Sequence, residues 1–395
     1  MIEGRVEKNK TIQWCMFLGS IVTFAILYSP QTLIQLFSNT YGISPTLASL
    51  PVSIATFTLA VTMLFVAVFS DAYGRKQIMV WSLLLASILN ILLAFSSNFY
   101  ILVGIRLIQG IVLGGFPALA MTYLSEEIKG NELGRIMGIY VAGSAFGAFL
   151  GRIVVSSISD FISWQAAVVT MGLLSLIMAF YFMKKLPNSS DFERRTLSFA
   201  NWCIGMKIAL FNKKLILVYG MGFLFLGVYV ALFNYISFPL SNEPFNMSQT
   251  LIGFLFIFQL TGTWGSYLFG RLSEKYQRAP LILLALVLAL VGSFLTLSSH
   301  LIVIMLGLML FAAGFLAGHS LASGWVGVIV ESHWRSYASS LYLLFYYTGS
   351  SVLGTMGGGF LVSNGWHGVI RMISTGLLLI AIFSMTLYFL SKNNK

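Results

Sequence analysis

Long apolar runs recur along the whole chain and limit its fold more than any other feature. A transmembrane helix needs about 20 apolar residues. Strands of a membrane β-barrel instead alternate over about 10 residues, and these runs do not alternate. We therefore predict an all-α membrane protein with twelve transmembrane helices, at 14–37, 46–69, 78–96, 98–122, 133–157, 164–183, 215–240, 249–270, 279–299, 301–327, 336–362 and 366–390.

The composition and the placement of charge agree with this class. Hydrophobic residues make up 58% of the 395 residues and charged residues only 9%, whereas soluble chains carry about 25% charge. The net charge of +11 would suggest nucleic acid in a soluble protein. Here 20 of the 23 basic residues fall on one side of the threaded chain. By the positive-inside rule, we expect both termini in the cytoplasm and no nucleic-acid partner.

The chain divides into two similar halves. One long polar stretch, 184–213, separates a predicted six-helix bundle at 1–183 from a second at 214–395, and we interpret it as a cytoplasmic linker. Segment 69–75 (FSDAYGR) matches segment 272–278 (LSEKYQR) at an offset of 203 residues. Trp164 matches Trp366 at an offset of 202. Ordered matches at nearly one offset indicate duplication, and two repeated bundles permit alternating access.

Two motifs carry a resemblance to the major facilitator superfamily. Residues 70–76 read SDAYGRK after the second span, and residues 106–110 read RLIQG in the fourth. The first resembles the family's Gly-x-x-x-Asp-x-x-Gly-Arg-Arg/Lys signature, with Ala67 in place of its first glycine. The resemblance implies the two-bundle fold of that family. It also implies a gate at this loop and at its repeat, formed by Asp71, Gly74, Arg75, Lys76, Glu274 and Arg278.

Three further strings are similar to the YnfM-type bacterial inner-membrane transporters. They read MTYLSEEI at 121–128, AGFLAGHSLASGW at 313–325 and SSLYLLFYYTGSS at 339–351. The resemblance implies a transporter in the cytoplasmic (inner) membrane of a bacterium and favours proton-coupled efflux of a small molecule. It does not identify the substrate.

Glycines recur at intervals of four in the fifth predicted span. Gly143, Gly147 and Gly151 lie on one helix face, and glycines let two helices approach closely. The exporter subgroup of the family has a glycine- and proline-containing element at this place, but this chain lacks the proline. Generic helix packing and a role in antiport remain as alternatives.

Polar residues on predicted helix faces are candidates for a substrate cavity. An arginine inside an apolar span costs about 2.5–3.5 kcal/mol or more, so Arg106 should face a cavity or a partner, unless its side chain reaches the outer surface. The candidates are Arg106, Gln109, Tyr28, Gln31, Asn234, Gln259, Trp264, His319 and Tyr346. The alternative for the aromatic members is helix packing. Aromatic residues and Arg106 favour a partly hydrophobic molecule with an anionic or zwitterionic group.

No acidic residue falls in the middle of a predicted span. Proton coupling would then involve acids at the cytoplasmic ends or a histidine, which titrates near neutral pH. The possible proton sites are Asp71, Glu126, Glu127 and His319. For His319 the alternative is a hydrogen-bonded packing role.

Other function classes fit less well. A membrane-embedded enzyme would need a catalytic cluster, and no nucleophile pattern, metal spacing or nucleotide-binding loop is found in the sequence. A channel would lack the repeated gate motif. We therefore expect a monomeric secondary transporter, not an enzyme, with no cofactor and no metal. Its partners would be a small-molecule substrate, protons and the lipid bilayer. The alternative is gradient-driven uptake or facilitated transport of a small anionic or zwitterionic metabolite.

Overall fold

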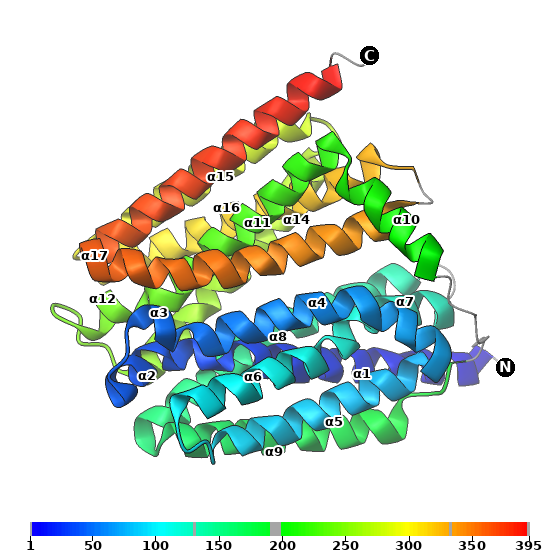
Figure 1. The fold of residues 1–395 in the computed structure, drawn as a ribbon, viewed down its shortest axis with the longest axis horizontal. Helices are drawn as coiled ribbons and strands as arrows, with labels where there is room; N and C mark the ends of the chain where they lie inside the picture. The colour runs from blue at the N-terminus through cyan, green and yellow to red at the C-terminus, as the bar shows by residue number, and fades with distance from the viewer. Residues whose placement is uncertain (1, 129–131, 190–198, 332–333, 393–395) are drawn as a thin grey trace. The chain divides into compact units, whose positions relative to one another are not determined.

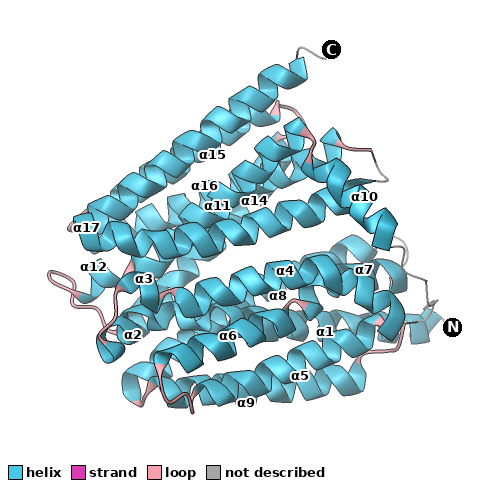
Figure 2. Ribbon diagram, in the orientation of Figure 1, coloured by secondary structure: helices cyan, strands magenta, loops and turns pink. Residues whose placement is uncertain are grey.

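The computed structural model describes residues 2–128, 132–189, 199–331 and 334–392. The side chains of residues 2–6, 67–69, 71–73 and 199–201 fall outside this description. Every regular element in the described ranges is a helix, and none of these residues forms a strand (Figure 2). The predicted all-α class is therefore confirmed.

The helices follow one another along the chain as Figure 1 shows. In chain order they are α1 (Ile2–Tyr28), the 3-10 helix η1 (Ser29–Leu33), α2 (Ile34–Tyr41), α3 (Pro45–Ala48), α4 (Leu50–Tyr73), α5 (Arg75–Leu93), α6 (Phe99–Leu113), α7 (Gly115–Glu127), α8 (Glu132–Phe161), α9 (Trp164–Lys185), α10 (Phe199–Leu210), α11 (Lys213–Tyr235), α12 (Ser237–Ser241), α13 (Gln249–Leu255), the 3-10 helix η2 (Phe256–Leu260), α14 (Thr261–Leu272), α15 (Arg278–Leu295), α16 (Leu301–Ile329) and α17 (Arg335–Lys392).

The twelve predicted spans all appear as helices. Ten continuous helical stretches among the described residues are long and apolar enough to cross a membrane. Leu50–Val66 in α4 is a further apolar helix. Asn364 and Gly365 have non-helical backbone angles and divide α17 into two parts. With α4 added to the ten stretches and α17 counted as two helices, the described residues contain twelve spans. The sequence did not predict α10, which lies inside the stretch interpreted as a linker.

The chain forms two compact units. The first comprises Met1–Leu33 and Ile54–Leu197, and the second comprises Ile34–Ser53 and Ser198–Lys395. Residues 34–53 thus group with the C-terminal part of the chain. Hydroxyl groups contribute to this packing: Ser241 Oγ donates to Gln35 Oε1 at 2.6 Å, and Thr355 Oγ1 donates to Ser53 Oγ at 2.7 Å.

In the first unit, α1 and α8 lie side by side along a line of glycines (Figure 1). A Cβ atom placed on Gly147 would lie 2.5 Å from the Ile21 Cα, and one on Gly151 would lie 2.6 Å from the Ala25 Cα. Gly143 faces Phe17 in the same way. The partners on α1 are spaced by four residues, as the glycines are. The backbones of α1 and α8 therefore meet so closely that these three positions of α8 leave no room for a side chain.

The second unit repeats these contacts. Gly349 of α17 faces Phe223 of α11, and a Cβ there would overlap the Phe223 carbonyl oxygen. Both residues of this pair lie 206 positions after Gly143 and Phe17. The duplication visible in the sequence therefore extends to the contact between helices.

A hydroxyl contact is repeated as well. Thr58 Oγ1 donates to the Leu107 carbonyl oxygen at 3.1 Å, and Thr261 Oγ1 donates to the Met309 carbonyl oxygen at 2.9 Å. The offsets are 203 for the donors and 202 for the acceptors. Each half thus joins the same pair of its helices by a threonine on one and a carbonyl on the other.

The close approach of α1 and α8 predicts that Gly147→Ala destabilises the protein, whereas Gly138→Ala does not. The added methyl group at Gly147 would overlap backbone atoms of Ile21, while nothing lies within 4 Å of the Gly138 position. Overpacking costs about 1–3 kcal/mol, and alanine is otherwise the better helix former by about 1 kcal/mol. Thermal unfolding in detergent should show a lower melting temperature for Gly147→Ala only. Equal melting temperatures for the two variants would contradict the packing described here.

Candidate substrate-binding and gating residues

Arg106 of α6 is fully buried in the first unit and binds the backbone of α1. Its Nη1 donates to the Ile26 carbonyl oxygen at 3.1 Å and its Nη2 to the Leu27 carbonyl oxygen at 2.8 Å. Nη1 also donates to Gln109 Oε1 at 2.6 Å. A buried arginine is tolerated where its N–H groups find acceptors of this kind.

Pro30 explains why these two carbonyl groups are available. α1 ends at Tyr28, and η1 begins at the next residue. In an α-helix the Ile26 oxygen would accept from the N–H of residue 30, and in a 3-10 helix the Leu27 oxygen would accept from the same residue. Proline has no N–H, so both oxygens lose their backbone donor. The guanidinium group of Arg106 replaces it.

Gln109 and Asn90 extend this network to neighbouring helices. Gln109 Nε2 donates to the Ala86 carbonyl oxygen at 2.9 Å and lies 3.3 Å from Asn90 Oδ1. Asn90 Nδ2 donates to the Val168 carbonyl oxygen of α9 at 2.8 Å. The side chains of Arg106, Gln109 and Asn90 are each 0% exposed. The network therefore joins α1, α5, α6 and α9. The assignment of Arg106 and Gln109 to a substrate cavity stays a prediction.

Arg152 of α8 is a second buried cation, and it contacts two of the predicted cavity residues. Its Nε and Nη2 donate to Gln31 Oε1 at 2.9 and 2.6 Å, and its Nη1 donates to the Ala148 carbonyl oxygen at 2.9 Å. The guanidinium carbon lies 4.9 Å from the ring centre of Tyr28, within cation–π range. Arg152 is 2% exposed. The structure thus places Tyr28 and Gln31 beside a positive charge within the first unit.

An ion pair lies at the turn between α4 and α5. Arg75 donates to both oxygens of Glu126, through Nε at 2.5 Å and Nη2 at 2.6 Å, and its Nη1 donates to Ser70 Oγ at 3.0 Å. Gly74 has a φ of +89°, which glycine adopts at little cost. The bidentate pair therefore joins the start of α5 to the end of α7.

The neighbouring acid, Glu127, binds a different helix. Its Oε2 pairs with Lys8 Nζ of α1 at 2.9 Å, and its Oε1 accepts from Ser189 Oγ at 3.2 Å. Lys76 is the second residue of α5. The side chain of Asp71 lies outside the described residues, so its predicted gating and proton roles remain predictions.

The repeat of the gate motif in the second unit has a different partner. Arg278 begins α15, and its Nη1 donates to the Gly324 carbonyl oxygen of α16 at 2.7 Å. Glu274 is exposed in the turn after α14. Arg278 thus has a carbonyl group where Arg75 has a carboxylate. Both arginines join the start of one helix to a later helix of the same unit.

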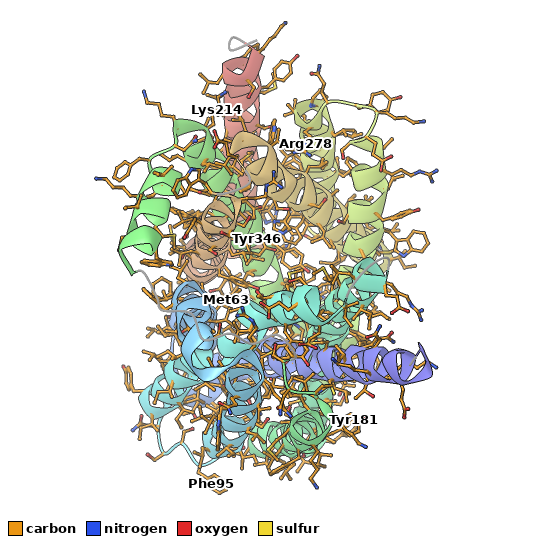
Figure 3. The ribbon with its side chains drawn as sticks, turned by 90° about the vertical axis from the view of Figure 1, so that its right-hand side faces the viewer. Met63, Phe95, Tyr181, Lys214, Arg278 and Tyr346 are labelled. Carbon is orange, nitrogen blue, oxygen red and sulfur yellow. The ribbon has the colours of Figure 1, made fainter. Side chains whose placement is uncertain are left out.

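His319 of α16 lies in a cluster of aromatic rings in the second unit. Its Nδ1 is 2.9 Å from Tyr342 Oη, and its ring stacks on Tyr346 at 4.3 Å and on Phe315 at 6.0 Å between centroids. Tyr229 stacks on Phe315 at 3.9 Å. We call Tyr229, Phe315, His319, Tyr342 and Tyr346 the ring cluster. Figure 3 labels Tyr346 among the side chains of this unit.

The remaining predicted cavity residues do not join the ring cluster. Asn234 is 0% exposed and donates to the Gly354 carbonyl oxygen at 3.3 Å. Gln259 lies in η2, and its buried Nε2 has no hydrogen-bond partner among the described residues. Trp264 is 80% exposed. Asn234 lies on α11, Gln259 in the 3-10 helix η2 and Trp264 on α14, so the three residues come from different elements.

Sequence reasoning missed the role of Arg152. Arg152 lies near the end of the fifth predicted span and was not among the candidate cavity residues. The signal that could have found it is its position next to Gly151, because a glycine contact brings Tyr28 of α1 and Gln31 of η1 within reach of the next residue on α8.

Comparison with known proteins places the chain in a family. The sequence model of the Major Facilitator Superfamily matches residues 16–243 and 234–395. The chain is 40% identical over 374 residues to the uncharacterized MFS-type transporter YybF of Bacillus subtilis, covering 95% of this chain and 92% of that protein. It is 38% identical over 373 residues to the inner membrane transport protein YnfM of Escherichia coli, covering 94% and 89%.

Solved structures share the fold. A crystal structure of a mutant of the nucleoside transporter NupG has a TM-score of 0.79 at 16% identity and covers 95% of this chain and 100% of that one. At this identity the likeness shows the fold alone. With the two long family matches and the relatives above 30% identity, the predicted resemblance and fold are confirmed: the chain is a membrane-spanning transporter of the Major Facilitator Superfamily.

Proposed function

We propose that the chain exports a small, partly hydrophobic organic molecule across the cytoplasmic membrane of a bacterium by proton-coupled alternating access. Both termini lie in the cytoplasm in this proposal, and the protein acts as a monomer. The direction of transport rests on the resemblance of strings such as 313–325 to the YnfM-type transporters. The nature of the substrate and the coupling rest on side chains.

The ring cluster carries the proposal. Stacked rings offer an apolar surface that binds flat or aromatic bodies, and ring pairs gain about 0.5–1.5 kcal/mol beyond burial. Tyr346 and His319 are each only half-buried, so their rings retain free surface. The Tyr342 hydroxyl and the imidazole add polar groups that can fix the orientation of a bound molecule.

Proton coupling is supported by groups that can change charge within or at the end of a span. The imidazole of His319, whose Nδ1 lies 2.9 Å from the Tyr342 hydroxyl, is a group that can carry a proton within a span. Glu126 forms an ion pair with Arg75, and Glu127 forms one with Lys8. Protonation of either acid would remove its charge and weaken its ion pair. We propose these two acids and Asp71 as the first proton sites, with His319 as the second.

A second candidate function is gradient-driven uptake or facilitated transport of a small anionic or zwitterionic metabolite. Arg152 favours it, because its guanidinium group places a buried positive charge beside Gln31 and Tyr28. A carboxylate on the substrate would form a charge-assisted hydrogen bond with such a group.

The ring cluster predicts that Tyr346→Ala weakens substrate binding about three- to tenfold, the equivalent of one lost ring contact. A thermal-shift screen of aromatic and aliphatic organic compounds on the wild-type protein would first identify ligands. Their dissociation constants would then be measured on the variant. Tyr267→Ala is the matched control, because Tyr267 is 68% exposed on α14 and should bind ligands as the wild type does. Unchanged affinity in Tyr346→Ala would contradict the assignment.

The surroundings of Arg152 predict that its substitution weakens the binding of anionic ligands more than that of uncharged ligands. Arg152→Gln should weaken anionic ligands at least about tenfold, because a charge-assisted hydrogen bond contributes about 1.5–3 kcal/mol, and should spare uncharged ligands. Arg152→Lys should keep part of the preference for anions. Melting curves without ligand show whether each variant folds. Equal loss for charged and uncharged ligands would mean that Arg152 serves only the packing of α1 and α8.

Proton coupling predicts a separation of two transport modes in liposomes. In Glu126→Gln, Glu127→Gln, Asp71→Asn or His319→Ala, at least one variant should lose accumulation driven by a pH gradient but keep substrate counterflow without a gradient. Glu7→Gln removes an exposed acid of α1 and should keep both modes. Full dependence on the pH gradient in all four variants would refute coupling through these residues.

A further inference from the structure

A pocket of about 350 Å³ lies in the second unit where α15, α16 and α17 come together. It is lined by Gln277, Arg278, Ala279, Trp325, Tyr388, Ser391 and Lys392. Its volume lies at the lower end of the range for small-ligand pockets, about 300–1,000 Å³. In Figure 1 the start of α15 and the end of α17 lie side by side. None of the ring-cluster residues contributes to the lining.

The charges of this pocket are all positive. Arg278 and Lys392 are its charged members, and no lining residue is acidic. Arg278 uses Nη1 to bind the Gly324 carbonyl oxygen at 2.7 Å. Neither cation has a carboxylate partner among the residues that the structure describes. A planar guanidinium group with remaining N–H groups is suited to phosphate oxygens.

The pocket lies at the end of three membrane spans. Arg278 is the first residue of the span Arg278–Leu295, Lys392 is the last residue of the stretch Arg335–Lys392, and Trp325 lies four residues before the end of Leu301–Ile329. Residues at the ends of spans sit at the level of the lipid head groups. Trp325 and Tyr388 fit this level, since tryptophan and tyrosine are enriched at membrane interfaces. Their N–H and O–H groups add hydrogen-bond donors.

From this arrangement we propose that the pocket binds a phosphate group, supplied by the head group of an anionic phospholipid. Basic pockets between transmembrane helices bind such head groups in other membrane proteins. Arg278 and Lys392 hold the phosphate oxygens, and the rings of Trp325 and Tyr388 border the glycerol region of the lipid. The same chemistry would accept a free phosphate compound, and the experiment separates the two sources. The proposal does not depend on the transported substrate, because binding is measured without transport.

The test uses the full chain in detergent, incubated with equimolar phosphatidylglycerol and phosphatidylcholine. Native mass spectrometry then gives the ratio of the two bound lipids. We expect the wild type to retain phosphatidylglycerol preferentially. Lys392→Gln should lower this preference about fivefold, the effect of one interfacial cation, and Arg278→Gln combined with Lys392→Gln should abolish it. Lys392 is exposed at the end of α17, so its single substitution does not threaten folding.

Lys214→Gln provides the matched control. Lys214 is the second residue of α11, at the start of another span of the same unit, and does not line the pocket (Figure 3). The substitution removes the same charge at a comparable position, so it should keep the wild-type lipid ratio. Arg278→Lys retains the charge but loses the planar guanidinium group, and it should fall between the wild type and Arg278→Gln.

The lipid ratios of the variants decide the proposal. Loss of the preference in the pocket variants and not in Lys214→Gln supports it. Wild-type preference in the double variant, or an equal loss in Lys214→Gln, overturns it. Inorganic phosphate is then added at millimolar concentration to the wild-type protein. Persistence of bound lipid supports the head group as the source, whereas displacement of the lipid overturns that source and assigns the pocket to a soluble phosphate compound.

Discussion

The close approach of two helix backbones is the contact on which each unit of this transporter depends. Gly147 and Gly151 bring α8 onto the backbone of α1, and Gly349 brings α17 onto α11. In a membrane the hydrophobic effect contributes little to the association of helices, so tight packing of small residues takes its place. The pairs Gly143–Phe17 and Gly349–Phe223 make the same kind of contact at an offset of 206 residues, so this packing is repeated in both halves.

This packing also positions the buried cations of the first unit. Because α8 meets α1 at Gly151, the next residue, Arg152, reaches Gln31 and Tyr28. Pro30 leaves two carbonyl groups of α1 without backbone donors, and Arg106 binds them from α6. A break in one helix thus creates the acceptors that make a buried arginine tolerable. Arg106 thus binds the last turn of α1, whereas Arg152 contacts Tyr28 at its end and Gln31 of η1.

The two copies of the gate motif differ in the group to which their arginine donates hydrogen bonds. Arg75 binds the carboxylate of Glu126, whereas Arg278 binds the carbonyl group of Gly324. A charge that is neutralised by a carboxylate contributes to the packing of its own unit. The charge of Arg278, which faces a pocket without acids, remains available to a ligand. Duplication therefore preserved the position of the arginine but not its partner.

The sequence by itself determined the all-α class, the twelve spans within a few residues and the family, because membrane spans require long apolar runs and the loop motif has a fixed spacing. It also made Tyr28, Gln31, His319 and Tyr346 candidates for a substrate cavity, a role that stays a prediction. Only the tertiary structure decided which of these meet. Helix periodicity gives the face of a residue but not the partner across from it, so Arg152 was missed. Likewise, the exposure of a side chain such as Trp264, which is 80% exposed, depends on the elements packed around it and not on its spacing in the sequence.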